Sequence, residues 1–434
     1  MYKLTSWGRY PQVDAVVHSS TSQTAIKQII RSSTKIISRG NGRSYGDSAL
    51  SEKILSSLQR DYLIELNEAA LTLKVQSGIV FSQLLQFLVP KGFFPPVVPG
   101  TKYITVGGAV ASDIHGKNHH KEGTFTNHVK KITLILSNGE TVECSRQINS
   151  DLFHATCGGM GLTGFIHDVE FSLKKIQSNR ILQISHKAHN LDELFTLFEV
   201  YKDSTYSVAW IDCLNTGHSL GRSIMLVGEH SNATENLNYS DNQFPIPVPQ
   251  MPEWVMNSKF IEAFNFLYFH KELKKVSNQK TTMDSFFFPL DKLKDWNRLY
   301  GKNGFTQYQF VLPKLSGKEG IKKILEKVTE EKNASFLAVL KYFGKSNENF
   351  LSFPMEGFTL SLDFKITPDL FAFLNELDQI VMDYQGRVYL SKDVCLSQEH
   401  FEKMYGEKIE VFQDVRRKYD AMKFESLQSR RLGL

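Results

Sequence analysis

Short runs in which apolar and polar residues alternate fill the chain from Thr34 to Leu173, with glycine-rich loops between them. Such alternation, rich in β-branched residues, predicts β-strands. Asn138-Gly139 is the dipeptide preferred by a type I′ hairpin turn, whose two central residues need positive φ. The four runs that carry these strands are KIISRGNGRSYGDSAL, LTLKVQSGIVFSQLLQFLVPKG, VKKITLILSNGETVECS and FIHDVEFSLKK.

The pattern changes beyond His186, where the glycine loops become rare and longer mixed segments follow. Helical spacing predicts helices over 191–201, over 317–332 and in the tail from Ser397 to Leu434. Residues 230–254 are polar and then proline-rich, which predicts a long loop that serves either as a linker or as a substrate lid. The apolar tail residues expected to face the core are Phe401, Met404, Tyr405, Val411, Phe412 and Val415.

Composition narrows the function classes. A net charge of +5 over 434 residues is compatible with anionic substrates but is far from the concentrated basic stripe of a nucleic-acid-binding protein. The spacing of the four cysteines fits neither a zinc site nor a disulfide scaffold, which indicates free thiols in a reducing compartment. We find neither a signal peptide nor an apolar run long enough to cross a bilayer, so a cytoplasmic location is expected.

Three glycine-rich loops carry the clearest chemistry. The first, RGNGRSYGD (39–47), can turn successive backbone N–H groups toward one anion such as a pyrophosphate, although an ordinary tight turn would look similar. The second, PGTKYITVGGA (99–109), would let a flat ligand approach the backbone closely. The third, GGMGLTG (158–164), contains a GxGxxG match, but the residues that follow it predict a strand, which excludes a Rossmann unit.

Together these loops predict a dinucleotide extended across a β-rich domain. The polar segment DIHGKNHH (113–120) follows the second loop and offers donors at its edge. A metal site at His115 and His119 is not expected, because Gly116 and Asn118 oppose a helix that would align the two rings and no carboxylate or thiolate completes the ligand set.

Gln307 and Gln309 alternate along an apparent strand and so share one face, which suits sugar hydroxyls as well as solvent.

These motifs resemble the vanillyl-alcohol oxidase type of FAD-binding proteins, and among them the decaprenylphosphoryl-β-D-ribose 2′-oxidase family, which serves synthesis of the arabinose donor of mycobacterial cell walls. The resemblance covers nearly the whole chain and rests most strongly on DIHGKNHH and QYQFV. It implies an α+β fold of two domains: an FAD-binding domain over 1–178, a substrate domain with an antiparallel sheet over 179–386, and a C-terminal segment over 387–434 that returns to the FAD-binding domain.

The resemblance also implies the site residues. FAD would be held non-covalently, since Arg43 stands where some relatives carry a flavin-linking histidine. Lys392 and His115 would be catalytic, with Lys392 stabilising charge that grows on the flavin. The implied substrate contacts are Lys117, Gln307, Gln309, Lys341, Phe343, Ser361 and Trp210. The implied FAD contacts are Arg39, Gly40, Asn41, Gly42, Arg43, Ser44, Tyr45, Gly46, Asp47, Gly100, Thr105, Val106, Gly107, Gly108, Ser112, Asp113, Ile114, His115, Ile166 and Tyr389.

The implied reaction is oxidation of the 2′-hydroxyl of a polyprenylphosphoryl ribose, as the first half of an epimerisation that a short-chain keto-reductase would complete. A lipid-linked sugar phosphate as substrate also implies peripheral membrane contact. The match departs at Ser361 and Met160, where mycobacterial members carry cysteine and asparagine. Two alternatives stay open: a sugar-lactone or alditol oxidase that acts on a soluble polyol, and a catalytically inactive flavin-binding scaffold.

Overall fold

The computed structural model describes residues 1–434 except 234–236, 240–244, 253–254 and 332–334. Its N-terminal region contains a four-stranded sheet in the order β1-β2-β4-β3 and a five-stranded sheet in the order β5-β6-β10-β8-β9. The strands are β1 (Tyr2–Thr5), β2 (Gln12–Ser19), β3 (Ile37–Arg39), β4 (Lys53–Ser56), β5 (Leu63–Asn67), β6 (Thr72–Gln76), β8 (Val129–Ile135), β9 (Thr141–Cys144) and β10 (Phe165–Ser172). The helices of this region are α1 (Gln23–Arg31), α2 (Phe81–Leu88), α3 (Val106–Ala111), α4 (His119–Glu122) and α5 (Ser150–Thr156).

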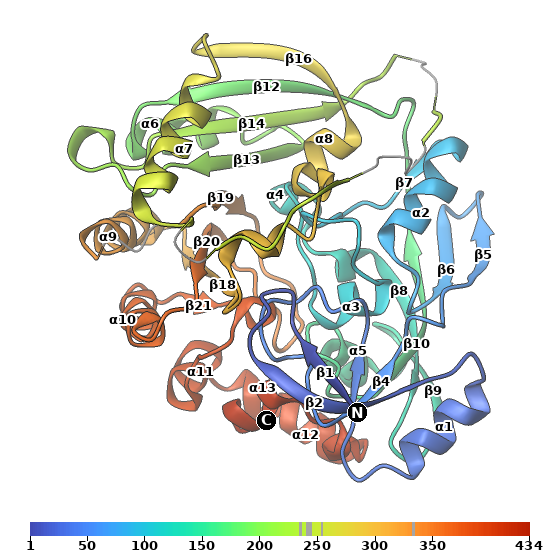
Figure 1. The fold of residues 1–434 in the computed structure, drawn as a ribbon. Helices are drawn as coiled ribbons and strands as arrows, with labels where there is room; N and C mark the ends of the chain where they lie inside the picture. The colour runs from blue at the N-terminus through green and yellow to red at the C-terminus, as the bar shows by residue number, and fades with distance from the viewer. Residues whose placement is uncertain (234–236, 240–244, 253–254, 332–334) are drawn as a thin grey trace.

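The second region is built on an eight-stranded sheet in the order β16-β12-β14-β13-β19-β20-β18-β21 (Figure 1). Each of its strand pairings is antiparallel. The strands are β12 (Arg180–Ala188), β13 (Tyr206–Ile211), β14 (Ser223–His230), β16 (Val276–Thr282), β18 (Phe305–Pro313), β19 (Ala338–Phe343), β20 (Gly357–Lys365) and β21 (Arg387–Val388).

Helices cover one face of this sheet, while the other face is turned toward the N-terminal region at β18 and β20 and carries residues 258–270 at β13 and β14. The helices α6 (Leu191–Val200), α9 (Gly317–Glu330) and α10 (Leu370–Asp383) pack on the covered face. Strand alternation explains the division: Tyr308 donates to Asp378 of α10, whereas Gln307 and Gln309 point to the opposite side. The remaining elements are the 13-residue helix α7 (Ser258–His270), the short helix α8 (Met283–Phe287) and the two-residue strands β7 (Phe93–Phe94), β11 (Lys174–Lys175), β15 (Ile246–Pro247) and β17 (Leu293–Lys294).

The chain after β21 lies against the N-terminal region. It forms α11 (Gln398–Tyr405), α12 (Lys408–Lys418) and α13 (Leu427–Leu432). Phe424 forms a bridge with Ile36, Arg416 donates to the carbonyl oxygen of Leu162, and Arg431 pairs with Asp47 at 2.8 Å. The two ends of the chain therefore pack together on one side of the molecule (Figure 1).

The structure confirms the predicted helices at 191–201 and 317–332 as α6 and α9, and the hairpin of β8 with β9. The type I′ turn is wrong, because of the two central residues only Gly139 has positive φ and the connection is longer than two residues. The run LTLKVQSGIVFSQLLQFLVPKG was expected to form strands, but part of it is the helix α2, whose apolar residues lie mainly on one buried side. Val411, expected in the core, is 45% exposed on α12.

Two further expectations need correction or fall partly outside the structure. The run RVYLSK (387–392) predicts a strand that ends at Lys392, but Lys392 lies in a short 3-10 turn, Leu390–Lys392, because β21 ends at Val388. The predicted loop 230–254 contains the short strand β15, and its interpretation as a lid falls in part on residues outside the described ranges. Among the helices of the described ranges, none is long and apolar enough to cross a membrane.

Candidate active site

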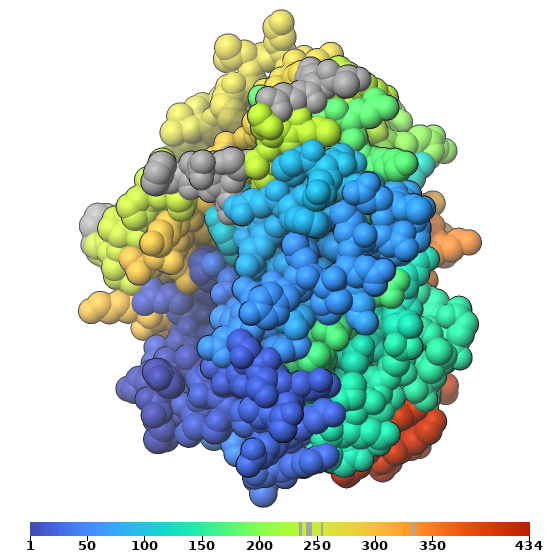
Figure 2. All heavy atoms as spheres, turned by 90° about the vertical axis from the view of Figure 1, so that its right-hand side faces the viewer, coloured from blue at the N-terminus to red at the C-terminus, as the bar shows by residue number. Residues whose placement is uncertain are grey.

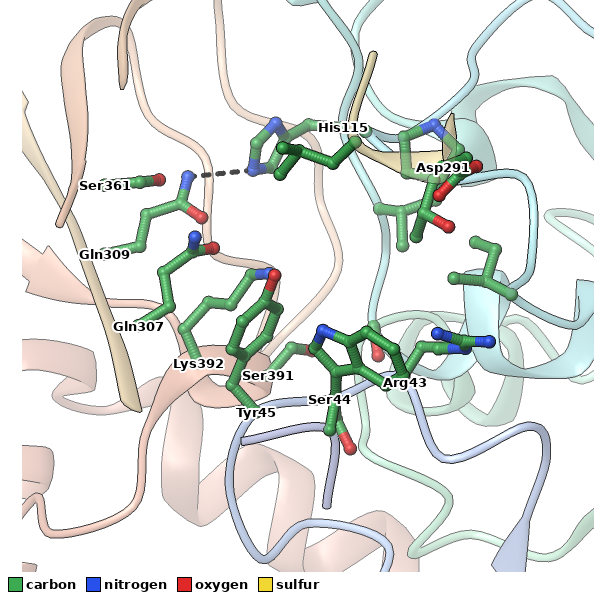
Figure 3. Close-up of a pocket in the computed structure, with 18 of the residues that line it drawn as sticks. Arg43, Ser44, Tyr45, His115, Asp291, Gln307, Gln309, Ser361, Ser391 and Lys392 are labelled. Atoms are coloured by element: carbon green, nitrogen blue, oxygen red, sulfur yellow. Dashed lines mark hydrogen bonds between the residues drawn. The ribbon is translucent and has the colours of Figure 1, made fainter. Parts of the chain in front are cut away.

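A cavity of about 720 Å³ lies between the glycine loops and the face of the eight-stranded sheet opposite to α6, α9 and α10. Figure 3 shows its two walls: Arg43, Ser44 and Tyr45 approach from the first loop, and glutamines of β18 face them from the sheet. The cavity is therefore formed between elements that are far apart in the sequence.

Most residues that the resemblance assigned to FAD line this cavity. They are Gly40, Asn41, Gly42, Arg43, Ser44, Tyr45, Gly100, Thr105, Gly107, Gly108, Ser112, Ile114, His115, Ile166 and Tyr389. Five others lie behind the wall: Arg39, Gly46, Asp47, Val106 and Asp113.

The residues behind the wall hold its loops in place. Arg39 donates to the carbonyl oxygens of Thr5 and Ala49, and Asp47 pairs with Arg431. A Cβ on Gly46 would stand 1.5 Å from the carbonyl oxygen of Asp393, so glycine is required where the first loop meets the C-terminal segment.

We call the side of the cavity formed by the three glycine loops the glycine wall, and the side formed by the eight-stranded sheet the sheet wall. The glycine wall fits a nucleotide that comes close to the backbone. Thr105 caps α3 by accepting from the backbone N–H of Gly108, and a Cβ on Gly40 would stand 2.2 Å from the Thr105 hydroxyl. Buried polar atoms of Ser38, Ser77 and Arg43 face this part of the cavity without a hydrogen-bond partner among the described residues. Buried donors normally find partners, so this wall is suited to a polar ligand such as the pyrophosphate of FAD.

The sheet wall brings His115 and Gln309 together. The Nε2 atoms of the two side chains are 3.0 Å apart, and Gln309 also donates to the hydroxyl of Thr359 at 3.1 Å. Burial, followed by the nearby Lys341, lowers the pKa of His115 well below its usual value. His115 is therefore neutral at physiological pH, and its Nε2 accepts from the Gln309 amide.

Three lysines face the cavity and are shifted toward neutrality. Burial lowers the pKa of Lys392 to about 7, the pKa of Lys117 to about 7 and the pKa of Lys341 to about 8. Lys392 places its ammonium 3.7 Å from the ring centroid of Tyr45, and Lys117 donates to the carbonyl oxygen of Phe287. Such perturbed lysines in one cavity are typical of a catalytic or anion-binding site.

Comparison with known proteins decides the family. Residues 12–145 match a family model described as FAD binding domain. The decaprenylphosphoryl-beta-D-ribose oxidase of Mycolicibacterium smegmatis is 33% identical over 451 residues, which cover 100% of this chain and 97% of that protein. The chain belongs to the decaprenylphosphoryl-β-D-ribose oxidase family.

Two further matches place this family among related proteins. An uncharacterized protein of Streptomyces coelicolor is 29% identical over 82% of this chain and 100% of its own length. Cytokinin dehydrogenase 2 of Arabidopsis thaliana is 26% identical, but over only 31% of this chain and 27% of its own length. The protein is thus an FAD-dependent oxidoreductase that acts on CH–OH groups, with the fold of the vanillyl-alcohol oxidase type.

The residues that resemblance to this oxidase family assigned to the substrate lie at different depths. Those that line the cavity are Lys117, Trp210, Gln307, Gln309, Lys341 and Ser361, and the catalytic candidate Lys392 lines it as well. Phe343 does not line it: its fully buried ring packs 4.7 Å from the ring of His115. Phe343 therefore supports His115 from behind.

Sequence reasoning missed Asp363 of this oxidase, which lies on β20 directly beside Gln307 of β18. Its carboxylate accepts from the Gln307 amide at 2.6 Å and from the Tyr300 hydroxyl at 3.1 Å. Burial raises the pKa of Asp363 to about 7, while the Gln307 hydrogen bond and the positive charge of Lys392 oppose the rise. Asp363 in turn favours the charged form of Lys392.

Trp7 and Asp291 of the oxidase were also missed. Both line the cavity, and the Arg43 guanidinium lies 4.0 Å from the centroid of a Trp7 ring. Asp291 accepts from the backbone N–H of Lys102, and its charge favours the charged form of Arg43. Neither residue belongs to a glycine loop, so no local pattern pointed to them.

Proposed function

We propose that this enzyme oxidises the 2′-hydroxyl of a polyprenylphosphoryl ribose to the keto sugar, as the first half of an epimerisation. One observation carries the proposal: across the sheet wall, a row of cavity-lining residues changes from polar on β18 and β20 to apolar on β19, β13 and β14. Cross-strand pairing aligns five residues from β18 to β14 in one row, namely Gln309, Ser361, Val339, Trp210 and Ile224.

The row suits an amphiphilic ligand. All five residues line the cavity, and strands lie roughly 4.8 Å apart, so the row spans about 19 Å from its polar to its apolar end. Val208 and Leu226 extend the apolar end on the same face of the sheet. A sugar would lie at Gln309 and Ser361, and a prenyl chain would lie along the apolar strands.

The polar end supplies the groups that the reaction needs. Bound FAD would accept a hydride from the carbon that bears the hydroxyl. Lys392, held against Tyr45, would stabilise the negative charge that develops near the sugar and the cofactor. Neutral His115, with its Nε2 fixed by Gln309, would contact the sugar, and the hydroxyl proton would pass to the neutral amine of a cavity lysine, because the pKa values of Lys117 and Lys341 are lowered to about 7 and about 8.

The proposal also accounts for the phosphate of the substrate and for the fate of the keto-sugar product. Lys341 lies on β19, between the polar and apolar strands, and Lys117 faces the same cavity, so both could pair with a phosphate. A keto sugar must be reduced from the opposite side to complete an epimerisation, which makes a short-chain keto-reductase the expected partner. The four free cysteines support a cytoplasmic site for both steps.

The two alternatives explain less of the cavity. A soluble polyol or sugar lactone has no apolar part to cover Trp210 and Ile224. An inactive scaffold gives no reason for three lysines with lowered pKa values around one cavity, because a buried charge is costly.

Anaerobic bleaching of the bound flavin tests the proposal. Polyprenylphosphoryl riboses should bleach it, while free ribose phosphate, sugar lactones and alditols should leave it oxidised. Trp210→Ser should weaken the apparent affinity for a long-chain substrate by roughly tenfold or more and leave a short-chain analogue nearly unaffected, since only the long chain would reach this part of the cavity, where Trp210 packs 4.6 Å from the ring of Tyr268. Leu182→Ser is a control for the substitution to serine on β12, the second strand from β13, where Leu182 is 48% exposed. Bleaching by alditols alone would assign the enzyme to soluble polyols.

A further inference from the structure

The helix α7 is apolar on opposite sides. Ile261 and Phe269 are buried, and Phe264 and Tyr268 line the apolar end of the cavity. On the outer side, Phe260 is 45% exposed, Phe266 54% and Leu267 68%. Packing on the sheet accounts for the inner side only, and a helix that is apolar all round normally has a second apolar contact.

The exposed apolar surface continues past the end of α7. Leu273 is 94% exposed and Val276, at the start of the edge strand β16, is 42% exposed. We call Phe260, Phe266, Leu267, Leu273 and Val276 the α7 face. This part of the chain lies at the end of the molecule remote from both termini, and yellow atoms of this part of the sequence protrude at the top of the space-filling view (Figures 1 and 2).

Basic residues outnumber acidic ones in the segment that carries the α7 face, although Lys275 pairs with Glu193 at 2.6 Å. The segment 258–280 contains Lys259, Lys271, Lys274, Lys275 and Lys280, against Glu262 and Glu272. Lys271 also lines the cavity and lies 3.5 Å from the ring centroid of Tyr268. Exposed aromatic and leucine side chains among lysines are typical of helices that lie in the interface of an anionic membrane.

A second exposed apolar cluster shows why charge matters. Leu58, Tyr62, Leu63 and Ile64 are between 37% and 62% exposed around β5. Their charged neighbours include Asp61, Glu65 and Glu68, which an anionic surface would repel. The charge around the α7 face instead attracts such a surface.

We infer that the α7 face docks on an anionic lipid bilayer, with its apolar side chains inserted among the headgroups and its lysines on the lipid phosphates. Docking there would turn the apolar end of the cavity toward the source of a lipid-linked substrate. That benefit rests on the proposed function, whereas the contact itself rests on the surface alone. A twofold contact between two copies would bring lysines against lysines, which disfavours a second copy of the chain as the occupant.

Flotation of the FAD-loaded protein with vesicles tests the inference. The protein should bind vesicles of phosphatidylcholine mixed with phosphatidylglycerol, bind pure phosphatidylcholine far less, and release from the mixed vesicles at high salt. Phe266→Gln together with Leu267→Gln should reduce binding to the mixed vesicles by roughly tenfold or more. Tyr62→Gln together with Ile64→Gln is the matched control and should bind like the parent.

The outcomes separate docking from catalysis. The Phe266→Gln, Leu267→Gln variant should bleach its flavin at the parent rate with a short-chain substrate in detergent, because neither residue lines the cavity. Parent protein that ignores the mixed vesicles, or equal binding by both double variants, would overturn the inference. The inference would also be overturned if sedimentation showed that the parent is a dimer and that the Phe266→Gln, Leu267→Gln variant is a monomer. Vesicle binding without bleaching by any lipid-linked pentose would leave docking intact and refute the proposed function.

Discussion

The two walls of the cavity differ in how they meet a ligand. The glycine wall offers backbone and small residues such as Gly40 and Gly108, with a few buried hydroxyls. The sheet wall offers long side chains from several strands, among them Gln309, Lys341 and Trp210. The glycine wall therefore holds a ligand by shape and close approach, while the sheet wall selects and activates one through particular functional groups.

The largest effect should come from removing Lys392. If its ammonium stabilises charge that grows during hydride transfer, Lys392→Ala should slow flavin reduction roughly a hundredfold or more while FAD stays bound. Lys392→Arg keeps the charge but changes its shape and reach, so it should restore activity only in part. Stopped-flow absorbance of the flavin under anaerobic conditions measures both rates.

Lys322→Ala on the exposed side of α9 is the control for loss of a lysine and should be neutral. Reduction of the Lys392→Ala variant at near the parent rate would pass the catalytic assignment to His115 or Lys117.

The glycine wall should fail in a different way. A Cβ on Gly108 meets only the Thr105 hydroxyl, at 3.1 Å, so a larger side chain would extend into the cavity without breaking the core. Gly108→Leu should weaken FAD binding roughly ten- to a hundredfold, a typical result of overpacking, and Gly108→Ala should fall between it and the parent. Fluorescence titration of the apoprotein with FAD measures the affinity, and circular dichroism checks the fold.

A second measurement tests the expectation that FAD is held non-covalently. Because Arg43 replaces a linking histidine, acid denaturation of the parent should release all of its flavin into the supernatant. Flavin retained on the denatured chain, or parent-like affinity in Gly108→Leu, would contradict our description of the glycine wall.

The same contrast explains what the sequence could predict. The glycine loops are local, since their conformation depends on neighbouring residues, and most of their residues line the cavity as expected. Asp363 could not be found in this way, because its role depends on a partner 56 residues earlier, Gln307, that strand pairing brings beside it. Asp291 likewise reaches the cavity only through the fold.

Local structure failed where tertiary contacts decided it. The apolar run that contains α2 could form a strand or a helix, and burial of Leu84, Leu85 and Leu88 on one side favours the helix. At Asn138 the turn dipeptide predicted the hairpin but not its geometry, since the Asn138 carbonyl oxygen accepts from Arg31 of α1. The pairing of the two chain ends was predicted through resemblance, because no local pattern encodes it.

A smaller effect tests the coupling of Asp363 to Lys392. The pKa of Lys392 is lowered to about 7, so its positive charge is present below that pH and is lost as the pH rises through it. The rate of flavin reduction should therefore fall on the alkaline side. Asp363→Asn removes the negative charge that favours the ammonium, lowers the pKa of Lys392 and should move this falling limb to lower pH.

The pH profile distinguishes this role from a structural one. Loss of a hydrogen bond to Gln307 alone would lower the rate at every pH and leave the limb in place. A falling limb that stays at the parent position in Asp363→Asn would show that Lys392 is not governed by this carboxylate.

The smallest effect is expected at Ser361, between the polar and apolar ends of the sheet wall. It pairs with Gln309 on one side and Val339 on the other, and its side chain faces the cavity. Ser361→Cys exchanges a hydroxyl for a thiol of similar size and restores the residue of the mycobacterial members. If Ser361 only shapes the wall, the rate of flavin reduction should change by less than about threefold, as for substitutions that remove no essential contact. A loss of tenfold or more would show that the hydroxyl binds the sugar directly. In that case β20 as well as β18 would contribute sugar-binding groups to the sheet wall.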